Sequence, residues 1–120
     1  MTGGAAPARA GTRFENDVKH YLETLGWFVV RAGGSHGCAD LVALRSDHQP
    51  WLVQCKRSDT PALPAQQWIT LWNTAIDHGA LPVLVYAEGH GPARRGTGLE
   101  WRYLLSPERD LKQLGRADPT

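Results

Sequence analysis

The sequence lacks the features that mark membrane and secreted proteins. None of its apolar runs approaches the roughly 18 residues of a membrane-spanning helix, and the segment MTGGAAPARAG lacks the apolar centre of a signal peptide. It has only two cysteines, Cys38 and Cys55, each in or beside an apolar run. This favours reduced thiols used as small core residues over a disulfide scaffold. We therefore expect a soluble, cytoplasmic protein.

Charge and motif content narrow the function classes further. The formal net charge is +1, so any contact with nucleic acid must come from local clusters of basic residues. Ser35 and His36 lie in no GxSxG motif, which argues against a serine hydrolase. His36, Cys38, His48 and Cys55 show no CxxC or HxxxH spacing, which argues against a zinc site. The chain also has no glycine-rich phosphate-binding signature.

The length of 120 residues suits one hydrophobic core. We expect a single domain over residues 12–106, between a disordered leader at 1–11 and a polar tail at 107–120 that forms a short helix or a frayed end. Apolar spacing predicts two amphipathic helices, and β-rich or alternating runs predict five strands. The expected elements are helix 12–25, strands 27–31, 40–44 and 51–56, helix 64–78, and strands 81–87 and 99–105. This order predicts an α/β fold with a mixed central sheet flanked by helices.

Polar side chains inside two of these strands need an explanation. In WLVQCK, Gln54 and Lys56 share one face because side chains alternate along a strand. Asp40 opens the neighbouring strand DLVAL, and hairpin pairing brings its carboxylate towards Gln54 and Lys56. Glu15 lies on the border of the apolar face of the first helix and can point along the packed surface. Carboxylate and amide oxygens around one point suit Mg²⁺, and an adjacent lysine can orient an attacking water.

Taken singly, these residues have simpler interpretations. Asp40 could be a strand-start aspartate, Lys56 an edge-strand lysine that blocks aggregation, and Glu15 an acid favoured by the helix dipole. Together they resemble a known pattern. Glu15, Asp40 and the run Gln54-Cys55-Lys56 are similar to the PD-(D/E)xK nuclease superfamily, and within it to the archaeal-type Holliday junction resolvases and their phage relatives.

The likeness covers roughly residues 12–87, and it departs from the family pattern at two positions. Ala39 stands where a proline usually precedes the aspartate, and Gln54 stands in place of an acidic residue, which makes a QxK variant. The resemblance implies a restriction-endonuclease-like fold and a divalent metal, Mg²⁺ with Mn²⁺ able to substitute. The implied metal ligands are Glu15, Asp40, Gln54 and the backbone carbonyl of Cys55.

The resemblance also implies catalytic and DNA-binding roles. Lys56 would be the catalytic lysine, and Ser35, in the loop GGSHG, would lie near the scissile strand with Arg31 beside it. The implied partners are branched DNA and a second copy of the chain, so that two sites cut two strands. The candidate DNA-binding residues are Arg13, Arg31, Ser35, Arg57, Arg94 and Arg95.

Three functions agree with these residues. The first is a metal-dependent endodeoxyribonuclease that makes paired incisions in four-way junctions. The second is a nicking, repair or restriction-type nuclease acting on duplex or flapped DNA. The third is a catalytically inactive DNA-binding protein, in which Gln54 marks the loss of the metal. Trp101 is open between a place in the core and a surface that stacks on a base.

Overall fold

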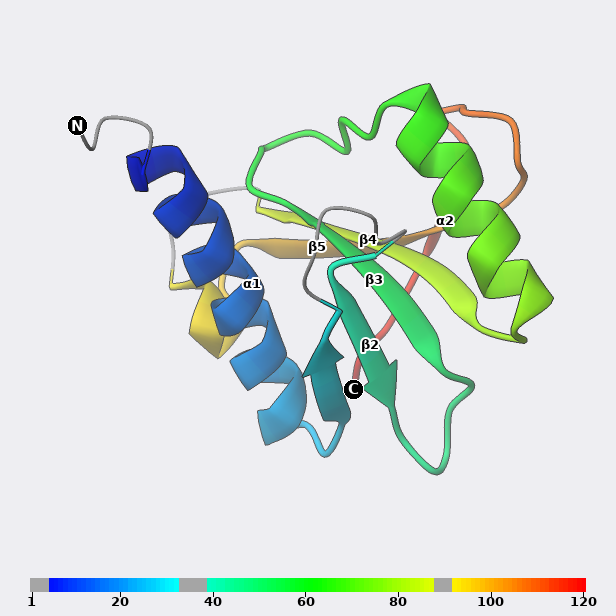
Figure 1. Ribbon diagram of the computed structural model, residues 1–120. Coiled ribbons are helices and arrows are strands. Elements are labelled where there is room, and N and C mark those ends of the chain that lie inside the picture. Colours follow the sequence, from blue (N-terminus) through cyan, green and yellow to red (C-terminus); the bar gives the residue numbers. More distant parts are fainter. Residues whose placement is uncertain (1–4, 33–38, 88–91) are drawn as a thin grey trace.

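The protein is built around a six-stranded sheet with a helix on each face (Figure 1). The computed structural model describes residues 5–32, 39–87 and 92–120, with side chains from Thr12 onward. The elements are α1 (Ala5–Thr24), β1 (Phe28–Arg31), β2 (Leu41–Leu44), β3 (Trp51–Lys56), α2 (Ala65–Asp77), β4 (Leu81–Ala87), η1 (Ala93–Arg95), β5 (Leu99–Leu104) and β6 (Leu114–Arg116). The mixed sheet and the two flanking helices confirm the expected α/β fold, with one strand more than the sequence predicts.

The first helix begins earlier than its apolar spacing predicts. It starts at Ala5, so Thr12 lies inside it and residues 5–11 of the expected leader are helical. Alanine has the highest helix propensity, and Pro7 is tolerated because it lies in the first turn, where backbone N–H groups have no partner inside the helix. Residues 1–4 of the expected leader lie outside the described residues.

Strands β1 to β3 form an antiparallel meander, and their register fixes the neighbours of each side chain. Leu41 is opposite Val53 and Val42 is opposite Leu52, as the expected hairpin requires. Strand β3 alternates between buried and half-buried residues, and Gln54 and Lys56 therefore lie on the face opposite Val53 and Cys55. Strand β4 pairs in parallel with β3, and α2 makes the connection between them.

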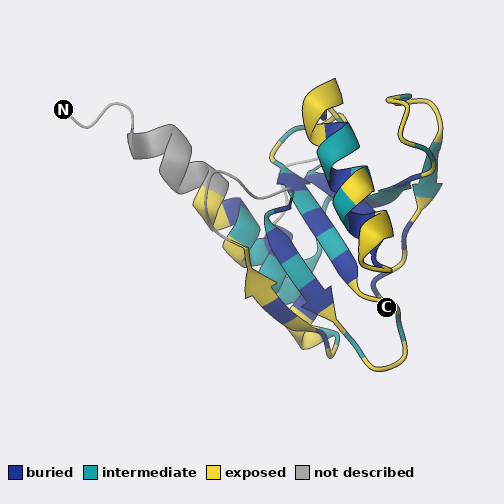
Figure 2. Ribbon diagram, turned by 45° about the vertical axis from the view of Figure 1, so that its right-hand side comes forward, coloured by how far each residue is buried: buried dark blue, intermediate teal, exposed yellow. Residues whose placement is uncertain are grey.

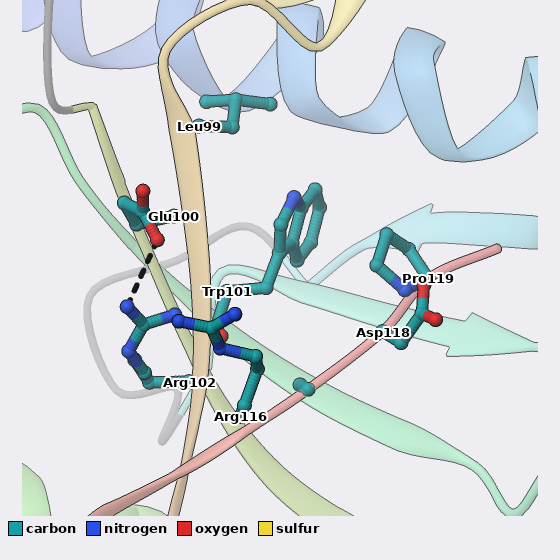
Figure 3. A pocket seen from close by; sticks show the side chains of 8 residues that line it. Leu99, Glu100, Trp101, Arg102, Arg116, Asp118 and Pro119 are labelled. Carbon is teal, nitrogen blue, oxygen red and sulfur yellow. Dashed lines mark hydrogen bonds and ion pairs between the residues drawn. The ribbon is translucent and has the colours of Figure 1, made fainter.

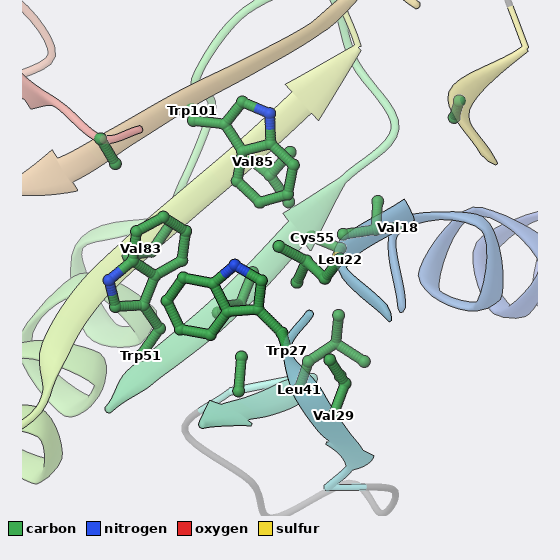
Figure 4. Packing of buried hydrophobic residues seen from close by; sticks show 14 of the residues in the cluster. Val18, Leu22, Trp27, Val29, Leu41, Trp51, Cys55, Val83, Val85 and Trp101 are labelled. Carbon is green, nitrogen blue, oxygen red and sulfur yellow. The ribbon is translucent and has the colours of Figure 1, made fainter. Parts of the chain in front are cut away.

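The core has two layers, one on each side of the sheet. The larger lies under α1, and Figure 4 shows Trp27, Trp51 and Trp101 gathered there with Leu22 and Val85. Ring centroids lie 4.6 Å apart for Trp27 and Trp51, and 6.0 Å apart for Trp51 and Trp101. Because Trp101 is only 7% exposed, it is a core residue and offers no surface for stacking on a base.

The second layer lies under α2 and leaves part of the sheet uncovered. Helix α2 packs Trp68 and Leu71 against Leu84 of β4. The outer face of β1 and β2 remains bare, with Phe28 65%, Val30 47% and Leu44 42% exposed. Figure 2 shows the edge strand β1 largely in the colour of exposed residues. Ile76, near the end of α2, is 52% exposed.

The segment after Pro107 is the largest difference from the expectation. It is neither a short helix nor a frayed end, because residues Leu114–Arg116 form β6, which pairs antiparallel with β5. Beyond β6 the backbone carbonyl of Pro119 accepts a hydrogen bond of 2.8 Å from the indole Nε1–H of Trp27. The tail therefore completes both the sheet and the core. Among the described residues, no helix combines the length and the apolar character that a membrane span requires.

Candidate active site

Asp40 is the best-fixed residue of the predicted site. Its backbone N–H donates to the carbonyl of Val53 and its own carbonyl accepts from Ala32, both at 2.8 Å. Asp40 directly precedes β2, and its backbone is hydrogen-bonded both to β3 and to the residue that follows β1. In the side chain, Oδ2 accepts hydrogen bonds from the Gln54 amide Nε2 at 3.0 Å and from the Cys55 backbone N–H at 2.8 Å. Two donors on one oxygen fix the orientation of the carboxylate.

Gln54 and Lys56 come from the end of β3 and lie on the same face as Asp40. Because Gln54 donates its Nε2 to Asp40, its Oε1 is the atom left to accept or to bind a cation. Lys56 is half-buried, and within the described part of the chain its ammonium makes no hydrogen bond or ion pair. Burial raises the pKa of the Asp40 carboxyl, and the positive charge of Lys56 offsets part of that rise. The structure therefore brings together the Asp40 carboxylate, the Gln54 amide and the Lys56 amine, as predicted.

Glu15 comes from α1, where burial raises its pKa, and it lies near enough to Asp40 for the negative charge of that residue to raise the pKa further. Its neighbours Phe14 and Val18 are buried, which places Glu15 at the margin of the packed helix face. Its Oε1 lies 3.3 Å from a guanidinium nitrogen of Arg31, at the end of β1. Arg31, for which a DNA contact is expected from the sequence, is an ion-pair partner of Glu15 in the structure.

The two carboxylates share an environment that disfavours negative charge. Burial raises the pKa of Asp40, while the Cys55 N–H and the charges of Lys56 and Arg31 offset part of that rise. Burial likewise raises the pKa of Glu15, the negative charge of Asp40 adds to the rise, and Arg31 opposes it. Desolvation and mutual repulsion favour the protonated forms, and Lys56 and Arg31 offset only part of this effect. A bound cation would favour the ionised forms of both.

The chemistry of the donor set fits Mg²⁺. Glu15 and Asp40 contribute two carboxylates, and Gln54 contributes an amide oxygen. Mg²⁺ binds oxygen ligands, uses one or two protein carboxylates and keeps several waters. Among the described residues, no three His, Cys, Asp or Glu side chains come together. Cys55 does not act through its thiol, because burial raises the pKa of that group well above its ordinary value.

The remaining predicted residues lie around this cluster or outside the described chain. Arg57 is exposed just after β3, and its guanidinium carbon lies 6.0 Å from the ring centroid of Phe14. Arg13 is exposed on α1, and the exposed pair Arg94–Arg95 is on η1, which packs against α1. Ser35 lies outside the described residues. These four arginines lie on α1, just after β3 and on η1, and none of them makes an ion pair with Glu15 or Asp40 among the described residues.

Comparisons with known proteins agree with this geometry. The sequence profile of a family described as archaeal Holliday junction resolvase (Hjc) matches residues 6–66, which include both carboxylates, Gln54 and Lys56. A solved structure with a similar fold is that of Hjc from Archaeoglobus fulgidus, described as a Holliday junction resolvase from an archaeal hyperthermophile. Its TM-score is 0.62 at 24% sequence identity, over 78% of this chain and 75% of that chain. Among curated proteins, none matches the sequence.

Proposed function

We propose a substrate, a cofactor and a mechanism from one premise: this chain belongs to the archaeal Holliday junction resolvase family. It is a junction-resolving nuclease, and we propose that it makes paired incisions in four-way DNA junctions with the help of Mg²⁺. The observation that carries this proposal is the carboxylate pair of Glu15 and Asp40 beside Gln54 and Lys56. Because its substrate is DNA, we place its action in the cytoplasm.

The proposed metal ligands are the carboxylates of Glu15 and Asp40, the Oε1 atom of Gln54 and the backbone carbonyl of Cys55. Mn²⁺ would occupy the same oxygen ligands. When bound, the cation supplies polarisation of the scissile phosphate and lowers the pKa of an attacking water. The support for this set is that both carboxyl groups are desolvated and that Asp40 raises the pKa of Glu15. Gln54 brings an oxygen without a charge, so the site holds two negative charges where an acidic residue would make three.

Lys56 would act on the phosphate during hydrolysis. Its ammonium is free of protein partners within the described part of the chain and lies close enough to Asp40 to influence its ionisation. Water attacks phosphorus opposite the leaving oxygen, a P–O bond of the DNA backbone breaks, and the leaving oxygen takes up a proton. The lysine would orient this water and stabilise the negative charge that develops on the phosphate oxygens.

Exposed arginines would hold the DNA on either side of this centre. We propose phosphate contacts for Arg13, Arg57, Arg94 and Arg95, because all four are exposed and lie on α1 or on segments next to it. Ser35 is proposed as a contact near the scissile strand. Arg31 would contribute to DNA binding only as far as its pairing with Glu15 allows.

A second copy of the chain would cover the bare apolar face. We define this face as Phe28, Val30, Val42 and Leu44, which lie in two cross-strand pairs, Phe28 with Leu44 and Val30 with Val42. Three of the four are more than 40% exposed. A contiguous apolar patch of this kind marks an interaction surface. A homodimer formed there would carry two active sites, as paired incision of a junction requires.

Cleavage of a labelled four-way junction tests the proposal, with the matching linear duplex as the comparison substrate. With Mg²⁺, the wild type should cut two opposite strands of the junction and leave the duplex intact. Lys56→Ala should reduce the rate at least about a hundredfold, as loss of transition-state charge stabilisation does, and should retain junction binding.

Lys112→Ala is the matched control, because Lys112 is an exposed lysine on the turn before β6; it should cut like the wild type. Wild-type rates from a well-folded Lys56→Ala protein would reject the assigned role of the lysine. Equal cutting of junction and duplex would instead assign a nuclease without selectivity for junctions.

A further inference from the structure

Two arginines face each other at an open groove at the β5–β6 edge of the sheet, away from the predicted site. Arg102 of β5 and Arg116 of β6 are directly opposite in the antiparallel register. The groove has a volume of about 310 Å³ and is also lined by Glu100, Trp101 and Asp118. Figure 3 shows the two guanidinium groups side by side. Like charges opposite each other destabilise a sheet unless something neutralises them.

The protein itself neutralises only one of these arginines. A guanidinium nitrogen of Arg102 lies 2.9 Å from the Glu100 carboxylate, and another donates to the carbonyl of Trp101 at 2.9 Å. Arg116 is exposed and makes no hydrogen bond or ion pair within the described ranges. Asp118, the second acid at the groove, accepts from the backbone N–H of Thr120 at 2.9 Å and makes no ion pair with Arg116 within the described ranges. Arg116 is therefore the arginine of the groove that lacks an ion-pair partner, although the two acids balance the two arginines in total charge.

The register places this charge on the same face of the sheet as the predicted site. Gln54 is opposite Leu84, Leu84 is opposite Arg102, and Arg102 is opposite Arg116. With neighbouring strands roughly 4.8 Å apart, Arg116 lies three strands, or about 14 Å, from Gln54. One DNA strand carries a phosphate for about every 3.4 Å of helix axis. Arg116 is thus about four base-pair steps from Gln54, within the length of one DNA arm, and Leu84 between them is buried beneath α2.

We propose that Arg102 and Arg116 bind a backbone phosphate of the DNA arm beside the cleaved position. A guanidinium offers parallel N–H donors that match phosphate oxygens, and Glu100 holds Arg102 in place for the second arginine to join. This inference rests on the proposed function, since the anion is part of the same DNA. Strands β5 and β6 would thus position the junction DNA without taking part in the hydrolysis itself.

Junction affinity measured without divalent metal tests this site, because binding is then separate from cleavage. Arg116→Gln should weaken binding roughly tenfold near 0.1 M salt, as expected for one lost charge-assisted contact. It should also reduce the slope of log affinity against log salt by about one. Lys112→Gln removes the same charge from the turn before β6 and should do neither. Arg116→Lys keeps the charge but not the parallel N–H donors, so it should keep the salt slope and lose part of the affinity.

The outcomes separate this inference from the proposed function. Unchanged affinity and salt slope in Arg116→Gln, with junction cutting by the wild type intact, would overturn the phosphate site alone. Weaker binding by Arg116→Gln with no cutting by the wild type would uphold the phosphate site while the proposed cleavage fails. A wild type that does not bind junction DNA would overturn both.

Discussion

At the scale of single residues, the Asp40 carboxylate lowers the stability of the folded protein at neutral pH and is at the same time a proposed metal ligand. Its pKa is raised by burial, so the folded protein holds the proton more tightly than the unfolded chain does. Proton binding by this group therefore stabilises the folded state, and the contribution is complete below about pH 3.9, the ordinary pKa of aspartate. The contribution is lost as the pH rises through the pKa of Asp40 in the folded protein. Asp40→Asn has no charge to desolvate. It should raise the free energy of unfolding at pH 7 and leave it nearly unchanged at pH 3, as measured by urea denaturation.

Added Mg²⁺ should stabilise the wild type but not the same Asp40→Asn variant. Mg²⁺ at about a hundred times its Kd should stabilise the wild type by about 2.7 kcal/mol and should leave Asp40→Asn unaffected. Asp59→Asn, at an exposed position after β3, is the control and should respond to Mg²⁺ like the wild type. Equal stabilisation of Asp40→Asn by Mg²⁺ would remove Asp40 from the proposed ligands.

Part of this residue-level geometry could be predicted from sequence. Side-chain alternation and a hairpin are sufficient to bring Asp40 to Gln54, and the structure joins them. The bond from the Cys55 N–H to Asp40 could not be foreseen, because it depends on how the chain enters β2. The pairing of Glu15 with Arg31 depends on how α1 is rotated on the sheet, which helical periodicity fixes only to within a broad face.

At the scale of elements, η1 holds the arginine pair against α1 through a glycine. Gly96 ends η1 with a φ of +81°, and a Cβ built there would lie 2.4 Å from the ring of Tyr21 on α1. Gly96→Ala combines a left-handed backbone with this collision, so the free energy of unfolding should fall by about 1–3 kcal/mol. Gly79→Ala is the control for the backbone alone, since its φ is +68° and nothing lies within 4 Å. Equal losses in the two variants would show that the contact with Tyr21 adds no stability.

Strands with a clear period were predictable and the last strand was not. LPVLVYA and LEWRYL contain enough residues to show continuous burial or alternation, and both form strands. LGR has three residues, too few for any period, and becomes β6 only because β5 offers it an edge. The alternation of β5 predicts the face on which Arg102 lies, but the position of Arg116 depends on β6. The groove between the two arginines therefore could not be predicted without β6.

At the scale of the whole molecule, the proposed homodimer depends on the bare apolar face. Phe28→Glu places a charge on the most exposed residue of this face, and it should shift the protein from dimer to monomer in analytical ultracentrifugation. Junction cutting should then occur as single, uncoordinated nicks, because the two sites are no longer held together. Leu111→Glu changes an exposed apolar residue outside the face and should remain dimeric. A Phe28→Glu dimer would move the interface elsewhere.

The hydrogen bond between Trp27 and Pro119 joins positions 92 residues apart. During synthesis, it can therefore form only after the site residues have been made. All the proposed metal ligands and Lys56 are synthesised before residue 57. Until residue 119 has left the ribosome, however, the indole of Trp27 has no acceptor and the core beneath α1 lacks Ala117, one of its buried members. Contacts of such long range form late in folding. A nascent chain thus contains all the proposed reactive groups before the core beneath α1 is complete.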